Sequence, residues 1–150
     1  MSPPDYVRVE EVQRACKELG LRDWTALSTA EVEPEEAAAI QSAIGAEAAI
    51  ISLEEFRRGL EVELEHGTQF PDANVTNNHP ILTGKIVLAH LKETLDYYSR
   101  LEVAELEGDL LKAIIGGKIE KVQTIYKKLL SAKRYLAEME AKRLGLGEFP

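Results

Sequence analysis

Residues 52–67 read SLEEFRRGLEVELEHG, and this stretch decides the fold class. Ser52 and Glu55 have the spacing of a capping box, in which the serine oxygen and the glutamate carboxylate each accept a backbone N–H at the start of a helix. Apolar residues then recur every three or four positions, and Gly67 is typical of the left-handed residue that ends a helix. The stretch therefore predicts an α-helix from Leu53 to His66.

Helix start and stop signals also occur along the rest of the chain, and no two adjacent segments alternate apolar and polar residues as paired strands do. Gly20 and Gly45 follow apolar-periodic segments, and Pro34 and Pro80 stand where a first helical residue is expected. We predict an all-α fold, a compact bundle of five or six helices with a long C-terminal amphipathic helix. The helices are expected at residues 9–19, 34–44, 53–66, 80–105, 106–115 and 118–144.

The 150 residues are enough for one helical domain with its own core. Within it we expect N-terminal helices in 1–50, a central helical pair in 53–106, basic helices in 107–144 and a tail in 145–150. Residues 68–79 (TQFPDANVTNNH) form a long polar connection, and such loops tend to be functional or mobile. Gly84 lies inside a predicted helix, where it indicates a point of close backbone approach.

Composition narrows the class of protein. The net charge is −8, but residues 1–108 carry −12 and residues 109–150 carry +4. The strongly negative charge of residues 1–108 makes binding to nucleic acid unfavourable. The apolar runs are too short for a membrane span. The N-terminus lacks a signal-peptide pattern, and the single cysteine, Cys16, suits a reducing compartment. We therefore expect a cytoplasmic protein.

The last helix carries a narrow apolar stripe in which residues are spaced alternately by three and four. The stripe consists of Val122, Ile125, Leu129, Ala132, Leu136 and Met139. Three interpretations are open: packing on the protein's own acidic helices, self-association as in a short coiled coil, or nucleic-acid contact by the surrounding basic face. Nucleic-acid contact is the least favoured of the three, because the negative charge of residues 1–108 would repel the phosphates.

A group of histidines and glutamates is the candidate for chemistry. Glu63 and His66 form a Glu-x-x-His pair at the edge of one apolar face, and His90 and Glu93 form the reversed pair on the next long helix. His90 is expected near the middle of its apolar face. If the two helices pack antiparallel, the four side chains meet and form a set that suits Zn, Fe or Mn.

The same four side chains have a structural interpretation. A buried histidine is commonly bonded to a neighbouring carboxylate or tyrosine, and Glu63 or the hydroxyls of Tyr97 and Tyr98 would satisfy His90 without a metal. A full di-iron site needs four helices and six ligands, more than are present. No nucleophile elbow or phosphate-binding loop occurs, so we assign no catalytic residue and no cofactor beyond this divalent metal.

The central part of the chain resembles an uncharacterised family of small helical proteins, a domain of unknown function. Its motifs are Phe-x-x-Gly-Leu, Glu-Leu-Glu-His-Gly, Asn-Val-Thr, Thr-Gly-Lys-Ile, Ala-His-Leu and Asp-Tyr-Tyr, found here in order within residues 53–102, with 1–50 and 107–150 outside. Asn78-His79 replaces the usual acidic residues, and Leu95 stands where a proline often precedes Asp-Tyr-Tyr. The resemblance implies a small helical fold and brings no established activity.

Two functions follow. The first is a non-enzymatic helical protein that acts through protein–protein surfaces, in a homo-oligomer or a larger assembly, of which a phage- or virion-associated one is a candidate. Its features are the stripe, the charge division and the apolar tail from Leu146 to Phe149. The alternative is a metal-binding protein that uses Glu63, His66, His90 and Glu93.

Overall fold

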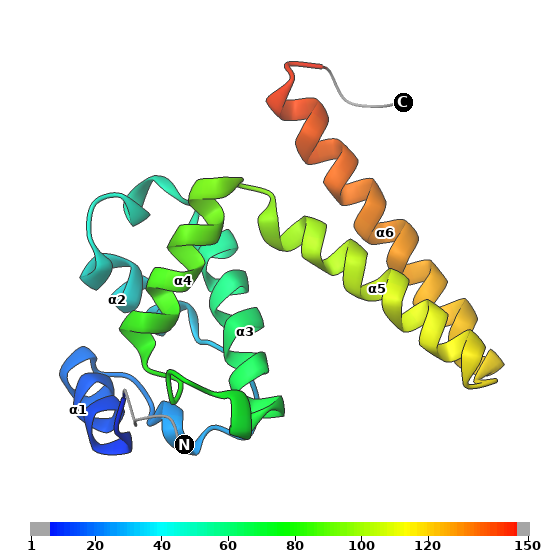
Figure 1. The fold of residues 1–150 in the computed structure, drawn as a ribbon. Helices are drawn as coiled ribbons and strands as arrows, with labels where there is room; N and C mark the ends of the chain where they lie inside the picture. Colours follow the sequence, from blue (N-terminus) through cyan, green and yellow to red (C-terminus); the bar gives the residue numbers. More distant parts are fainter. Residues whose placement is uncertain (1–6, 147–150) are drawn as a thin grey trace. The chain divides into compact units, whose positions relative to one another are not determined.

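The computed structural model describes residues 7–146, and Figure 1 shows its helices along the chain. All the regular secondary structure of these residues is helical, which confirms the all-α prediction. The α-helices are α1 (Val9–Leu19), α2 (Pro34–Ile44), α3 (Leu53–Gln69), α4 (Pro80–Glu93), α5 (Tyr97–Ile115) and α6 (Ile119–Arg143), and the 3-10 helices are η1 (Trp24–Ala26), η2 (Ala48–Ile50) and η3 (Pro71–Ala73). Helices and loops divide into two units, residues 1–95 and residues 96–150. The predicted tail lies mostly outside the described residues.

The N-terminal unit packs α1 to α4 around one apolar core. Trp24, Phe56 and Leu60 are fully buried there, together with Ile40 and Val87. Local signals place the helices: Gly20 ends α1 in the left-handed conformation, and the Ser52 hydroxyl accepts the Glu55 N–H at 3.3 Å to begin α3.

Gly84 is a point of close approach inside α4, and the atoms that approach it most closely belong to side chains and not to another backbone. A Cβ added there would lie 2.7 Å from Ile40 Cγ2 and 3.4 Å from Phe56 Cζ. Because only a hydrogen fits at this position, α4 turns the side of Thr83 and Gly84 into the core. Packing against α2 and α3 thus depends on a residue that contributes no apolar surface of its own.

The prediction that α3 ends at His66 is wrong. The helix continues through Gly67 to Gln69, and the chain then passes through η3. Gly67 is needed for space instead, since a Cβ there would lie 2.1 Å from Asn78 Oδ1 and 2.9 Å from Asn74 Nδ2. The glycine therefore lets the following loop fold back onto α3.

The predicted helix from Pro80 past Leu101 is interrupted. It ends at Glu93, because Thr94 is extended (φ −157°, ψ 136°), and α5 then runs without a break through the boundary predicted at 106. Buried Asp96 lies at the break, 2.8 Å from Arg100 Nη2 and 3.1 Å from Arg143 Nη1. The two guanidinium groups compensate the charge of this buried carboxylate, and the apolar spacing alone does not predict the break.

The C-terminal unit is a hairpin in which α5 and α6 pack together. The stripe predicted on the last helix is the least exposed face of α6, with Leu129 and Ala132 buried. Helix α5 is acidic, with four acidic and two basic side chains, so the stripe packs on an acidic helix of the same chain. The first of the three interpretations of the stripe therefore describes this hairpin.

Candidate functional site

The structure brings together three of the four candidate ligands. Glu63 on α3 lies between two imidazoles: its Oε2 is 3.9 Å from His66 Nδ1, and its Oε1 is 3.6 Å from His90 Nε2 on α4. The Glu63 side chain is 16% exposed and that of His66 is 54% exposed. Glu93 is the last residue of α4, and it is exposed and makes no ion pair or hydrogen bond within residues 7–146.

The sequence predicted that His90 lies near the middle of the apolar face of its helix, and this prediction is wrong. Its side chain is 32% exposed, because the buried side of α4 follows Pro80, Thr83, Gly84 and Val87 and ends at Leu91. Hydrophobicity alone centres the face on the wrong residues, since it does not count Thr83 and Gly84 as buried. His90 therefore lies at the border of the core, beside Glu63.

These contacts are those of a polar network at the rim of the α3–α4 interface. Among residues 7–146, no group of three or more His, Cys, Asp or Glu side chains is placed to hold a metal ion. The distances from Glu63 to the two histidines, 3.6 and 3.9 Å, are longer than those of normal hydrogen bonds. The arrangement holds two imidazoles beside one carboxylate across two helices.

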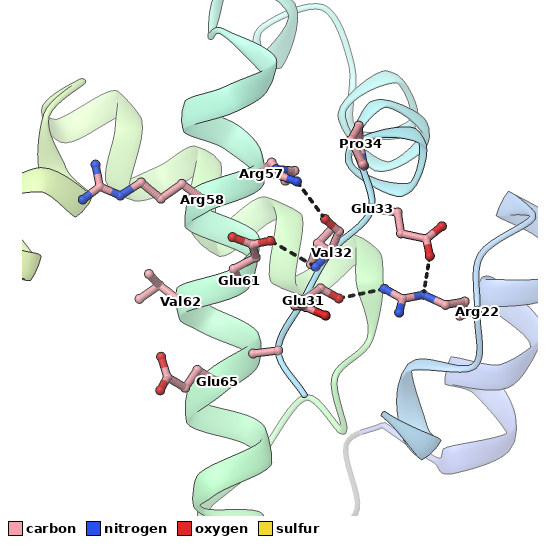
Figure 2. Close-up of a pocket in the computed structure, with 11 residues that line it drawn as sticks. Arg22, Glu31, Val32, Glu33, Pro34, Arg57, Arg58, Glu61, Val62 and Glu65 are labelled. Carbon is pink, nitrogen blue, oxygen red and sulfur yellow. Dashed lines mark hydrogen bonds and ion pairs between the residues drawn. The ribbon is translucent and has the colours of Figure 1, made fainter. Parts of the chain in front are cut away.

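A groove of about 660 Å³ lies between α3 and the segment that leads into α2 (Figure 2). Its charged side chains hold that segment: Glu61 Oε1 accepts the Val32 N–H at 3.2 Å, and Arg57 Nη1 donates to the Val32 carbonyl at 3.5 Å. Arg22 Nη2 donates to the carbonyl of Glu31 at 2.7 Å. These charged side chains bond backbone atoms of the segment that leads into α2. Their presence in the groove is therefore explained by the fold itself.

Beside this groove is a buried charge that sequence reasoning missed. Glu36, in the first turn of α2, is 4% exposed and accepts hydrogen bonds from Arg22 Nη2 at 2.7 Å and Trp24 Nε1 at 3.3 Å. Burial opposes ionisation of Glu36, but the hydrogen bonds from Arg22 and from the Glu33 amide outweigh it, so its pKa lies below the usual value. The only available signal was an acid in a first helical turn, which is common on helix surfaces.

The polar connection predicted to be functional or mobile is held by its own side chains. Asn74 Nδ2 donates to Asn78 Oδ1 at 2.8 Å, and Asn78 Nδ2 donates to the Trp24 carbonyl at 3.4 Å. Asn77 and Asn78 both have positive φ, 48° and 61°, a conformation that asparagine tolerates better than most residues. His79 then begins α4, since its Nδ1 accepts the Ile81 N–H at 3.2 Å. The Asn-Val-Thr motif thus serves turn geometry.

The outer surface of the hairpin follows a regular pattern of contacts. Arg100 Nη2 pairs with Glu140 Oε1 at 2.7 Å, and Lys133 Nζ pairs with Glu107 Oε1 at 2.8 Å. From the first pair to the second, the chain advances seven residues on α5 and goes back seven on α6. Residues seven apart lie on the same side of a helix. Both ion pairs therefore lie on one face of the hairpin.

One further step of seven reaches Ile114 and Tyr126, so an apolar pair follows the two ion pairs on this face. Leu111 and Leu130 lie on the same side, because each is three or four residues from its neighbours in the series. All four side chains are half exposed or more: Leu111 58%, Ile114 53%, Tyr126 51% and Leu130 50%. We call these four residues the hairpin patch.

The fold and these sites define a small all-helical protein whose polar clusters are largely explained by its own structure. None of the described helices is both long and apolar enough to cross a membrane. The profile of a protein family described as "Protein of unknown function (DUF5661)" matches residues 12–107, and the chain belongs to this family. No curated protein and no solved structure matches the chain.

The family match is wider than the motifs in residues 53–102 indicated. It begins within α1 and includes α2, so the expectation that residues 1–50 lie outside the family is wrong. The match ends within α5, and α6 lies beyond it. The family match therefore covers most of the N-terminal unit, with the Glu63 cluster, and the first part of α5, and it brings no activity with it.

Proposed function

We propose that this protein acts through protein–protein contact as a component of a larger assembly, and that the α5–α6 hairpin is its docking element. The observation that carries the proposal is the hairpin patch, where four large apolar side chains lie together on one face and remain at least half exposed. Contiguous exposed apolar surface is typical of an interaction site, whereas single exposed apolar residues are normal.

The charges around the patch support the same function. Helix α6 has seven basic and three acidic side chains, whereas α5 has two basic and four acidic ones. A surface with an apolar centre and a charged rim can use its charges to select a partner and its orientation. The clusters in the N-terminal unit offer less, because the groove charges and Glu36 are already bonded within the chain.

A photo-crosslinking amino acid at position 126 tests the proposal in cells that contain the protein. The expected result is a protein adduct formed from position 126. The matched control places the same group at Thr124, which is exposed and lies about 200° around α6 from Tyr126. Equal adduct formation from both positions, or none from position 126, would contradict docking through the patch.

Metal binding by Glu63, His66, His90 and Glu93 is a second candidate, supported by one observation: Glu63 lies within 4 Å of both imidazoles. Thermal melts with zinc, manganese, iron(II) and EDTA test it. A metal bound to the folded state raises Tm as its free concentration increases, and EDTA reverses the change. A Tm that none of these additions changes would leave the cluster as a structural network.

A further inference from the structure

We propose that the partner of the hairpin patch is a second copy of this chain, and that two hairpins form a four-helix bundle. The two-fold axis runs parallel to α5 and α6, so that α5 of each copy lies against α6 of the other. This inference rests on the proposed function and specifies its partner.

The bundle geometry follows from the hairpin. Helices α5 and α6 run antiparallel within one chain, and rotation about an axis parallel to them brings α5 beside α6 of the second copy, again antiparallel. Every neighbouring pair of helices is then antiparallel, as in up-down-up-down bundles. Leu111 and Ile114 on one copy would cover Tyr126 and Leu130 on the other.

Charge complementarity selects this orientation. Glu107 and Lys133 form one ion pair on the patch face, and the rotation places Glu107 opposite the second copy's Lys133. Acid and base then alternate around a ring of four side chains. The pair of Arg100 and Glu140 gives a second ring of the same kind.

The other symmetric orientation turns the axis across the hairpin. It places α5 on α5 and α6 on α6, and so brings Lys133 on the patch face, and the net positive α6 as a whole, against their own copies. Like charges that face one another across an interface are unfavourable. The ion pairs and the uneven charge of the two helices therefore both favour the parallel axis.

Sedimentation of the full chain over a range of micromolar concentrations, at low salt, measures the association. We expect a monomer–dimer equilibrium that Tyr126→Glu shifts at least tenfold towards monomer and that Thr124→Glu leaves unchanged. Each variant adds one carboxylate at an exposed position of α6, so added charge alone does not separate them. Circular dichroism should show equal helix content in all three proteins.

A double charge exchange, Glu107→Lys with Lys133→Glu, tests the orientation. The exchange preserves the ion pair within each chain and the alternation in a dimer of two exchanged chains. In a mixed dimer with wild type, however, like charges face one another at this ring. We expect wild-type and exchanged chains to form separate dimers, and mixed dimers to fall well below the statistical half in native mass spectrometry.

Three results would overturn the proposal: a strict monomer, a dimer that Tyr126→Glu does not weaken, and statistical mixing with the exchanged chain. The photo-crosslinking experiment separates this failure from failure of the proposed function. An adduct of position 126 with a different protein retains docking through the patch and excludes the second copy as its partner. A position that gives no adduct contradicts both.

Discussion

Two glycines inside helices decide how the N-terminal unit packs. Because Gly84 has no side chain, Ile40 can pack directly on the backbone of α4. Gly67 likewise leaves space for the side chain of Asn78 to pack on α3. The sequence indicated the first, because an isolated glycine in a helix suggests close contact. The prediction for Gly67 was wrong, since a glycine after a polar helical residue is also typical of a helix end. The partner of Gly67 is a loop asparagine, and local spacing cannot reveal it.

Gly67→Ala should destabilise the fold. The added Cβ would meet Asn78 Oδ1 at 2.1 Å, and Asn78 is itself held by its bond to the Trp24 carbonyl. We expect a loss of about 1–3 kcal/mol in unfolding free energy, as for other overpacked sites. Gly108→Ala is the matched control, because its Cβ would have no atom within 4 Å and should stabilise α5 by about 0.5–1 kcal/mol. Urea unfolding measures both, and a harmless Gly67→Ala would contradict the packing described.

His79 couples the start of α4 to pH. Its Nδ1 accepts the Ile81 N–H, which requires a neutral imidazole. Burial lowers the pKa of His79 below its ordinary value of 6.5 and outweighs the nearby Glu11 carboxylate, which raises it. As the pH falls, His79 is therefore protonated at a higher pH in the unfolded chain than in the folded chain.

The consequence is a loss of stability in mild acid. The contribution of His79 is complete above pH 6.5, falls as the pH drops below this value, and levels off once the folded state is also protonated. His79→Asn should keep an N-cap and remove the titration. We expect urea unfolding from pH 7.5 to 5 to show a steeper loss for wild type than for His79→Asn. Parallel curves would contradict the role of His79.

At the scale of elements, most helices could be predicted because their starts and stops are local. Pro34, Ser52 and Gly20 mark boundaries that the structure retains. The break between α4 and α5 could not be found in this way, since the groups that meet buried Asp96 at the break include Arg143 from a distant helix. The proline expected at Leu95 from the family pattern was the one signal for it, because proline disfavours helix continuation. This chain has Leu95 at that position, and the helix still breaks there.

The stripe of α6 should be needed for the hairpin itself. Leu129 is 4% exposed on the face that packs on α5, so Leu129→Glu places a carboxylate in the hairpin core. We expect loss of helical signal from the C-terminal unit at any protein concentration. Tyr126→Glu, three residues earlier and on the exposed patch, should keep the helices intact. Full helix content in Leu129→Glu would show that the stripe does not hold the hairpin together.

At the scale of the whole molecule, the sequence indicated the Glu63 cluster and missed the hairpin patch. Helix periodicity placed Glu63 and His66 on one side of α3, and the pairing with α4 brought His90 near. The patch was missed because its α6 residues lie beside the dominant stripe, where isolated apolar residues are unremarkable. Only the pairing of Arg100 with Glu140 and of Glu107 with Lys133 sets the register that joins Ile114 to Tyr126.

Hydrogen exchange at two protein concentrations tests most directly whether the hairpin patch is an association surface. Association of folded chains suppresses the local opening that exposes amides, so exchange slows where the interface lies. We predict slower exchange at the higher concentration in peptides from residues 108–132, and unchanged exchange in α1 to α4. Identical exchange at both concentrations, or protection confined to the N-terminal helices, would contradict association through the patch.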